Sequence, residues 1–186
     1  EPSIDYVVTK IPRFTFEKFS TSEAILGTSM KSVGEAMAIG RNFKESLQKA
    51  LVSLEIGFSG LDRIFPLNKK EIEKELKKNI PNRILLVAEA FRKKINIKRI
   101  HQLCKIDPWF LEQIKEIVDE ENQIQKNGLP KDYNEFNRIK SIGFSDKKLS
   151  VITKISEDVV RKKRTALKVL PVYKKVDTCA AEFKSF

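Results

Sequence analysis

The amino-acid sequence predicts a mainly α-helical fold, an irregular bundle of six or seven short helices that follows a small β-strand segment. Helix-start patterns recur between about residues 56 and 170, and each precedes apolar residues at three- and four-residue spacing. Runs rich in Val, Ile, Tyr and Thr occur near the amino-terminal end, with no second cluster downstream. Hydrophobic residues make up 41% of the 186 residues, which favours a folded core over disorder.

Two strands are expected in the first forty residues. The stretch from Ser3 to Phe14 predicts a strand that ends at Pro12, and the apolar run Val33–Ile39 predicts a second, mostly buried strand. The polar connection between them is expected to be anchored by Phe14, Phe16 and Phe19. Two strands alone do not form a stable sheet in water, so these residues are expected to need a further partner sheet.

The stretch Met30–Leu51 predicts the boundary between strands and helices. Gly40 is expected to leave the strand with a positive φ, a conformation that glycine adopts without steric cost. Asn42 then caps a helix, with Glu45 reaching back to the cap as in a capping box. One face of this helix carries Phe43, Leu47, Ala50, Leu51 and Leu54.

Each downstream helix has its own start pattern. The expected starts are Asn68–Glu71, Pro81–Asn82, Asn96, Asp107–Pro108, Asp132–Glu135, Ser145 and Ser156. The helix after Asp107–Pro108 is expected to end near Gly128. Its inward residues are expected to be Phe110, Ile114, Ile117, Val118 and Ile124.

A search for reactive constellations predicts no catalytic, cofactor-binding or metal-binding residue. His101 is the only histidine and lies in no metal-ligand spacing, so a structural role is expected. Gly34, Gly40, Gly57 and Gly60 form no phosphate-binding loop. The run Asp119 to Glu121 is expected to be a solvated helix face. The single tryptophan, Trp109, is expected to lie in the core rather than to form a stacking platform.

The formal charge of +11 raises nucleic acid as a partner. Between Arg161 and Lys175 there are seven basic residues and no acidic one, and the preceding text has the outline of a helix-turn-helix. A basic helix-turn-helix-like nucleic-acid-binding module is therefore the alternative function. Against it, the second helix would begin with Ser156, Glu157 and Asp158, whose carboxylates would repel phosphates. Nucleic acid is thus an unfavoured partner, and a basic surface facing another protein domain is preferred.

Cysteine usage and hydropathy suggest a cytoplasmic protein. Cys104 and Cys179 lie far apart and form no disulfide framework, so free thiols in a reducing compartment are expected. No apolar run approaches the roughly 18–20 residues of a membrane span, so no membrane partner is expected.

Several motifs resemble the large subunit of glutamine-dependent carbamoyl-phosphate synthase. They are EPSIDYVVTKIPRF, MKSVGEAMAIGR, ESLQKAL followed by LEIG, DPWFL followed by QI, GF near Gly143, and VYKKVDTCAAEF. The resemblance covers the whole chain in order and is most specific at both ends. It implies a fragment: residues 1–55 close the first, carboxyphosphate-forming ATP-grasp half, residues 56–170 form the helical oligomerisation domain, and residues 171–186 link into the second synthetase half.

The family resemblance also implies the parent reaction, in which an ATP-dependent ligase makes carbamoyl phosphate from bicarbonate, glutamine-derived ammonia and two ATP. This reaction feeds arginine and pyrimidine biosynthesis. ATP and magnesium or manganese are cofactors implied for the parent only, and no catalytic residue is carried over to this chain. The implied partners are the remainder of the large subunit, a glutaminase small subunit, and further copies bound through the helical domain.

Self-association would be served by an exposed apolar patch on the helices. The segments Leu67–Leu76 and Ile84–Phe91 are the expected candidates. A third class of function, an autonomous enzyme, would need a nucleotide or metal site that the sequence does not contain, so the chain alone is expected to be inactive.

Overall fold

The computed structural model describes residues 5–14, 16 and 24–178. Phe19 and Cys179, named above, lie outside this range. The described residues form two strands and eight helices: β1 (Val7–Phe14), β2 (Ser32–Gly40), α1 (Phe43–Ser53), α2 (Lys69–Glu75), α3 (Arg83–Arg92), α4 (Ile97–Cys104), α5 (Pro108–Asn127), α6 (Tyr133–Ser141), α7 (Asp146–Thr153) and α8 (Glu157–Ala166). The predicted mainly helical fold with a small preceding β segment is confirmed.

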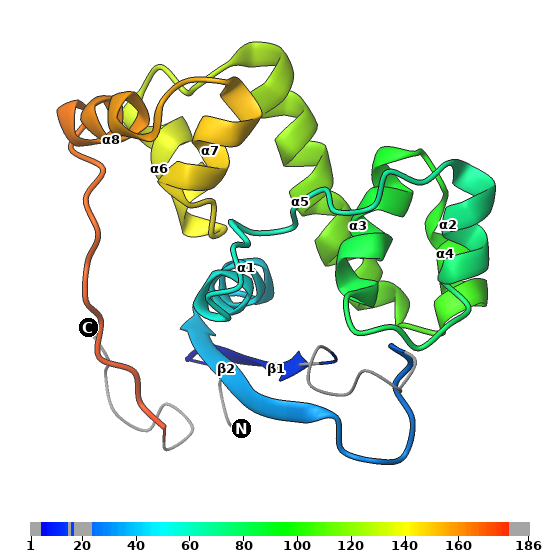
Figure 1. Cartoon of the computed structure of the whole chain (residues 1–186). Coiled ribbons are helices and arrows are strands. Elements are labelled where there is room, and N and C mark those ends of the chain that lie inside the picture. Colours follow the sequence, from blue (N-terminus) through cyan, green and yellow to red (C-terminus); the bar gives the residue numbers. More distant parts are fainter. Residues whose placement is uncertain (1–4, 15, 17–23, 179–186) are drawn as a thin grey trace.

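Strands β1 and β2 pair antiparallel, with Val7 opposite Gly40 and Ile11 opposite Ala36. The face that carries Ala36 and Ala38 is buried beneath α1, as the alternation of a half-buried strand requires. Figure 1 shows the resulting β-ribbon along one side of α1. The expected end at Pro12 is wrong, because β1 continues to Phe14. In a two-stranded ribbon every strand is an edge strand, where the missing N–H of proline is tolerated.

Helix α1 is packed closely between glycines that approach its backbone. Gly40 does not adopt the expected positive φ. Its constraint is steric instead, because a Cβ at this position would lie 2.7 Å from the backbone nitrogen of Ser46. Gly143 has a φ of +98°, and its Cβ would lie 3.0 Å from the Cα of Glu45. Both glycines therefore let neighbouring segments contact α1 directly.

The start of α1 differs slightly from the expected capping box. The side chain of Asn42 accepts a hydrogen bond of 2.9 Å from the backbone N–H of Glu45, as predicted. The carboxylate of Glu45 accepts from the backbone N–H of Arg41 at 2.7 Å, one residue before the expected partner. The polar groups at this helix start are still satisfied within the local sequence.

The 20-residue helix α5 runs through the helical region and connects two groups of helices. Figure 1 shows α2, α3 and α4 on one side, with α6, α7 and α8 on the other. Helices α3, α4 and α7 all contact α5, which places parts of both groups against one continuous core. The fully buried side chains include Leu86, Ile100, Ile114 and Phe136.

Most of the predicted helix starts are confirmed by side-chain caps. Asn68 and Glu71 form a complete capping box at α2. The side chains of Asn96, Asp107, Asp132 and Ser145 accept backbone hydrogen bonds at the starts of α4, α5, α6 and α7. Asn82 and Ser156 occupy the cap positions of α3 and α8 without a side-chain cap bond.

The first turn of α5 departs from the expected pattern. Trp109 is 51% exposed and Phe110 is 41% exposed, so the predicted core positions of both residues are wrong. Leu111 is fully buried and takes the inward position, three residues before the buried Ile114. The inward stripe thus begins one residue later than expected, and the helix start projects its aromatic side chains beyond the core.

Candidate interaction surfaces

No metal centre is assembled within residues 5–14, 16 and 24–178, since no three His, Cys, Asp or Glu side chains there are arranged to hold an ion. None of the helices in the same range is both long and apolar enough to cross a membrane. Cys104 is a buried free thiol at the end of α4. The prediction that the chain carries no catalytic or cofactor-binding residue stays a prediction.

His101 closes a turn of the backbone. Its Nδ1 atom lies 2.8 Å from the carbonyl oxygen of Ile106, within hydrogen-bond distance, and the side chain is half-buried. This contact joins the end of α4 to the segment that leads into α5. The geometry agrees with the structural role expected from the sequence.

Five charged side chains form a buried ionic joint between the two groups of helices. The guanidinium of Arg92 on α3 donates to Glu121 on α5 at 2.7 Å. The ammonium of Lys148 on α7 lies 2.9 Å from the other oxygen of Glu121 and 3.0 Å from Asp62. Glu89 pairs with Arg92 at 3.3 Å. The ionic joint therefore connects α3, α5, α7 and the loop that contains Asp62.

Glu121 contradicts the expectation of a solvated acidic face. Its side chain is 6% exposed, and Arg92 and Lys148 are 3% and 4% exposed. Lys148 supplies an ionic neighbour to Glu121 Oε1, although no directed hydrogen bond reaches that oxygen among the described residues. Burial of these charges is tolerated because each cation faces at least two carboxylates.

The loop end of the ionic joint is held by local hydrogen bonds. Asp62 accepts from the backbone N–H of Ser59 at 2.6 Å and from its hydroxyl at 2.7 Å. Burial alone would raise the pKa of Asp62, but the Ser59 hydrogen bonds and the Lys148 charge together hold this pKa below its ordinary value. The ionised carboxylate is therefore the form that the folded protein stabilises.

A second polar cluster surrounds Asp146 at the start of α7. Its carboxylate accepts from Lys140 at 2.8 Å and from Arg164 at 3.1 Å. Burial would raise the pKa of Asp146, yet these cations lower it. Burial lowers the pKa of Lys140, whose ammonium also donates to the carbonyl of Phe144 at 2.7 Å. These bonds fix the turn between α6 and α7 and attach α8 to it.

The same contacts weaken the nucleic-acid alternative. Arg164 is engaged by Asp146, and Arg161 donates to Glu157 at 2.7 Å, so two of the basic residues in this stretch are already paired. The amino-terminal turn of α8 presents Glu157 and Asp158, with Asp158 84% exposed. A recognition helix would place these carboxylates close to phosphate groups, where they are repelled.

The apolar patch expected on α2 and α3 is not present at the surface. Ile72 and Leu76 are fully buried, and the apolar side chains from Leu85 to Phe91 are at most 8% exposed. These side chains pack against one another and against α5, so the assignment of segments Leu67–Leu76 and Ile84–Phe91 as an exposed patch is wrong. The apolar side chains of these two segments supply the core rather than a contact surface.

An aromatic cluster instead lies partly exposed where α1 meets the first turn of α5. The ring of Phe43 lies 5.6 Å from Trp109 and 5.2 Å from Phe110, measured between centroids. Trp109 and Phe110 are perpendicular to each other at 5.0 Å, a favoured edge-to-face arrangement. The cluster therefore both attaches α1 to α5 and leaves aromatic surface facing solvent.

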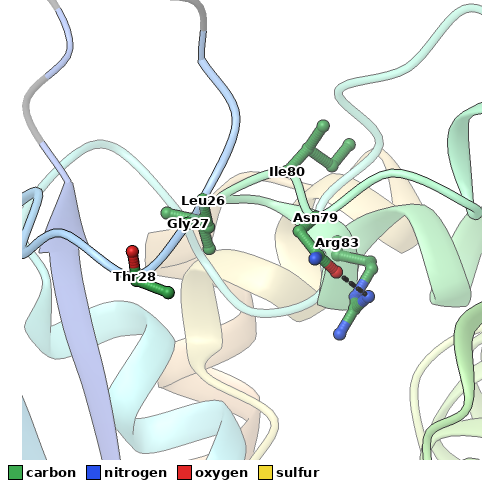
Figure 2. Close-up of a pocket in the computed structure, with 6 residues that line it drawn as sticks. All are labelled: Leu26, Gly27, Thr28, Asn79, Ile80 and Arg83. Carbon is green, nitrogen blue, oxygen red and sulfur yellow. Dashed lines mark hydrogen bonds between the residues drawn. The ribbon is translucent and has the colours of Figure 1, made fainter.

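A shallow cleft of about 400 Å³ separates the connection after β1 from the turn between α2 and α3. Figure 2 shows Leu26, Gly27 and Thr28 facing Asn79, Ile80 and Arg83 across it. The backbone N–H of Leu26 donates to the Asn79 carbonyl at 2.6 Å, and Arg83 donates to the Asn79 side chain at 2.8 Å. These bonds hold the connection against the helices.

An irregular helical lobe with a continuous core, an internal ionic joint and a partly exposed aromatic cluster has the features of a structural domain. The family model described as "Carbamoyl-phosphate synthetase large chain, oligomerisation domain" matches residues 35–168. The chain therefore belongs to this family. The match begins within β2 and ends just after α8.

Curated relatives match along the entire chain. The carbamoyl phosphate synthase large chain of Haemophilus ducreyi is 53% identical over 186 residues, and that of Brucella melitensis biotype 1 is 52% identical over 191 residues. The corresponding large chain of Neisseria meningitidis serogroup B is 52% identical over 98% of this chain. This chain spans only 16–17% of the length of these relatives, or about a sixth.

Proposed function

We propose that the chain is a segment of the large subunit of glutamine-dependent carbamoyl-phosphate synthase, in which it acts as the oligomerisation domain and as the spacer between two synthetase halves. The observation that carries this proposal is the family match over residues 35–168, supported by identity of about one residue in two over the full chain. In this proposal residues 1–55 close the first half, residues 56–170 are the helical domain, and residues 171–186 lead into the second half.

The activity belongs to the parent protein in this proposal. The parent is an ATP-dependent ligase that forms carbamoyl phosphate from bicarbonate, ammonia and two ATP in the cytoplasm. ATP and magnesium or manganese bind elsewhere in the parent, and a glutaminase small subunit supplies the ammonia. The ionic joint supports the spacer role, because it connects α3, α5 and α7 and so resists sliding between the two helix groups.

The proposal is tested first on the full-length chain. Purified full-length protein, supplied with bicarbonate, ammonium, ATP and magnesium, is expected to form carbamoyl phosphate. Failure to form it under conditions where a known synthase does so would refute the parent assignment. Calorimetric titration of residues 1–186 with ATP and magnesium is expected to give no binding heat, and saturable binding would show a nucleotide site in this segment.

Self-association is tested by sedimentation velocity of the full-length chain over a range of concentrations. We expect the sedimentation coefficient to rise with concentration. In a matched chain, a flexible linker replaces residues 56–170. The sedimentation coefficient of this chain is expected to stay constant as the concentration rises. If both chains associate equally, the helical domain is not the association domain.

A further inference from the structure

A second shallow cleft, of about 500 Å³, lies between the end of α1 and the helices α6, α7 and α8. Val52 and Phe58 give it an apolar lining, and Lys140, Asp146 and Glu157 give it a polar lining. A space of this volume is large enough for a small molecule. Two of the polar residues, Lys140 and Asp146, belong to the polar cluster at the start of α7.

The amine nitrogen of Lys140 lies at the wall of this cleft. Its ammonium donates to the Phe144 carbonyl at 2.7 Å and to the Asp146 carboxylate at 2.8 Å, which uses two of its three N–H groups. No third acceptor lies within hydrogen-bond distance of it in the part of the chain that the structure describes. The side chain is 25% exposed, so a small molecule in the cleft can reach the nitrogen.

Positive charge is in excess around Lys140. The carboxylate of Asp146 is shared by Lys140 at 2.8 Å, Arg164 at 3.1 Å and Arg161 at 4.0 Å. Glu157 supplies a second carboxylate, which pairs with Arg161 at 2.7 Å, so three cations face two carboxylates. A guanidinium keeps its proton at any physiological pH. Lys140 is therefore the cation of this group that can relieve the excess by losing a proton.

The surroundings of Lys140 also favour its neutral form. Burial is the main cause that lowers its pKa, and the like charge of Arg164 lowers it further, while the two carboxylates oppose both effects. A lower pKa enlarges the fraction of neutral amine, and only the neutral amine is a nucleophile. The other charged residues of the lining, Glu55 and Lys147, have opposite signs and are both exposed to solvent. Lys140 is thus the amine of the cleft in which burial and charge favour the nucleophilic form.

We propose that Lys140 is a carbamoylation site, at which the neutral amine reacts with a small carbamoyl donor in the cleft. With carbamoyl phosphate, the amine nitrogen forms a bond to the carbonyl carbon, and the bond from that carbon to the phosphate oxygen breaks. Phosphate leaves with the electron pair and takes up the amine proton. The product is an uncharged urea group on the lysine side chain. The identity of the donor rests on the proposed function, in which the parent forms carbamoyl phosphate.

Carbamoylation removes one positive charge from the cluster. The neutral side chain keeps N–H groups for the Phe144 carbonyl, but it no longer forms an ion pair with Asp146, which retains Arg164. Since Lys140 lies on α6 and Asp146 lies on α7, the modification weakens the contact that fixes the turn between these helices. An accumulating carbamoyl donor therefore changes the packing of the helical region.

Treatment of the full-length chain with potassium cyanate at neutral pH tests this reactivity. Isocyanic acid, which forms from cyanate in water, adds to a neutral amine and gives the same urea product without a leaving group. Mass spectrometry of peptides over a time course is expected to show Lys140 carbamoylated at least about threefold faster than Lys147, the exposed lysine of the same cleft. Lys148, which is 4% exposed and paired with Glu121, is expected to react most slowly. A rate at Lys140 that is equal to or below the rate at Lys147 would overturn the proposal.

Two substitutions separate the effect of charge from simple access. Arg164→Gln removes the like charge and is expected to slow the carbamoylation of Lys140, whereas Asp146→Asn removes the carboxylate that favours the ammonium and is expected to speed it. Both changes loosen the cluster, so a faster reaction in both variants would show that access controls the rate and would refute the inference.

Asp119→Asn, which removes a 49% exposed carboxylate on α5, is the control and is expected to leave the rate at Lys140 unchanged. Because cyanate is supplied, the reaction does not depend on the activity of the chain. A chain that forms no carbamoyl phosphate but has a fast Lys140 refutes only the parent assignment. An active chain with a slow Lys140 refutes only this inference.

Discussion

Replacing Glu121 by alanine tests whether the ionic joint stabilises the fold. The change removes the carboxylate that lies 2.7 Å from Arg92 and 2.9 Å from Lys148, and it leaves two cations that are at most 4% exposed. Removing one partner of a buried ion pair costs about 3–5 kcal/mol. Arg92 retains Glu89 and Lys148 retains Asp62, so we expect a loss near the lower limit, about 3 kcal/mol.

Glu120→Ala is the matched control, because it removes the adjacent carboxylate on the same helix. The carboxylate of Glu120 accepts two hydrogen bonds from Arg138, at 2.7 and 2.8 Å; the Arg138 side chain is 51% exposed, and that of Glu120 is 11% exposed. Because the Arg138 cation is exposed, water and salt screen the attraction, and we expect this pair to contribute about 0.2–1 kcal/mol. The two variants thus differ by one position in the sequence and mainly by the burial of the partner cations.

Equilibrium unfolding in urea measures both losses. Wild type and the two variants are compared at constant pH and ionic strength, and the midpoints are converted with a shared slope if the slopes agree. If Glu121→Ala loses no more stability than Glu120→Ala, the ionic joint stabilises the fold little more than a surface ion pair does. Equal slopes exclude an altered denatured state as the cause.

Three further predictions concern glycine packing, acid stability and the inward face of α5. Gly143→Ala should lower the free energy of unfolding in urea by about 2–4 kcal/mol, because this position combines a positive φ with close contact against α1. Gly57→Ala is the control, since Gly57 has a positive φ but open space around it, and it should lower the same free energy by about 1–2 kcal/mol. The pKa of Asp62 in the folded protein lies below the ordinary 3.8. The ionised carboxylate therefore stabilises the fold above that pH, and this contribution is lost as the pH falls through the folded pKa. Between pH 5 and pH 3 the thermal midpoint of Asp62→Asn should fall less than the midpoint of the wild type. Leu111→Ala should lower the free energy of unfolding by about 2–5 kcal/mol, and Trp109→Ala should lower it by about 1 kcal/mol. A larger loss for Trp109→Ala than for Leu111→Ala would show that Trp109 lies in the core, as the sequence predicted.

The helix starts could be predicted because their causes are local. Asn68, Asn96 and Asp107 each satisfy backbone N–H groups within three residues of themselves, so the relevant partner is visible in the sequence. Gly40 shows the limit of this reasoning. Its position at the strand end was predictable, but the physical reason is the approach of Ser46 in the folded chain rather than a positive φ.

The ionic joint could not be predicted from the acidic run alone. The partners of Glu121 come from α3 and α7, and Arg92 is 29 residues away in sequence. One signal was available, because Glu121 lies three residues after Val118 and three before Ile124, on the inward stripe of α5. An acid on an inward stripe predicts a buried cationic partner, although it does not identify which one.

The error over the surface patch has a different cause. The segments around Ile72 and Leu86 each carry an apolar helix face, and a single sequence does not reveal whether another helix of the same chain covers that face. In the fold they face α5 and each other, and no large surface is left over. Exposed apolar residues lie instead on the β-ribbon. Side chains alternate between the two faces of a strand, and α1 covers only one face, so Met37 and Ile39 on the other face are exposed.

The ionic joint and the close glycine contacts together explain how α1 and the two groups of helices hold a fixed relative orientation. Apolar packing between α5 and its neighbours fills space but permits small sliding movements, whereas the joint sets defined distances between Arg92, Glu121 and Lys148. The glycine contacts at Gly143 and Gly40 bring α1 against both the helices and the β-ribbon. The orientation of the β-ribbon is thus coupled, through α1, to the helices on both sides of α5.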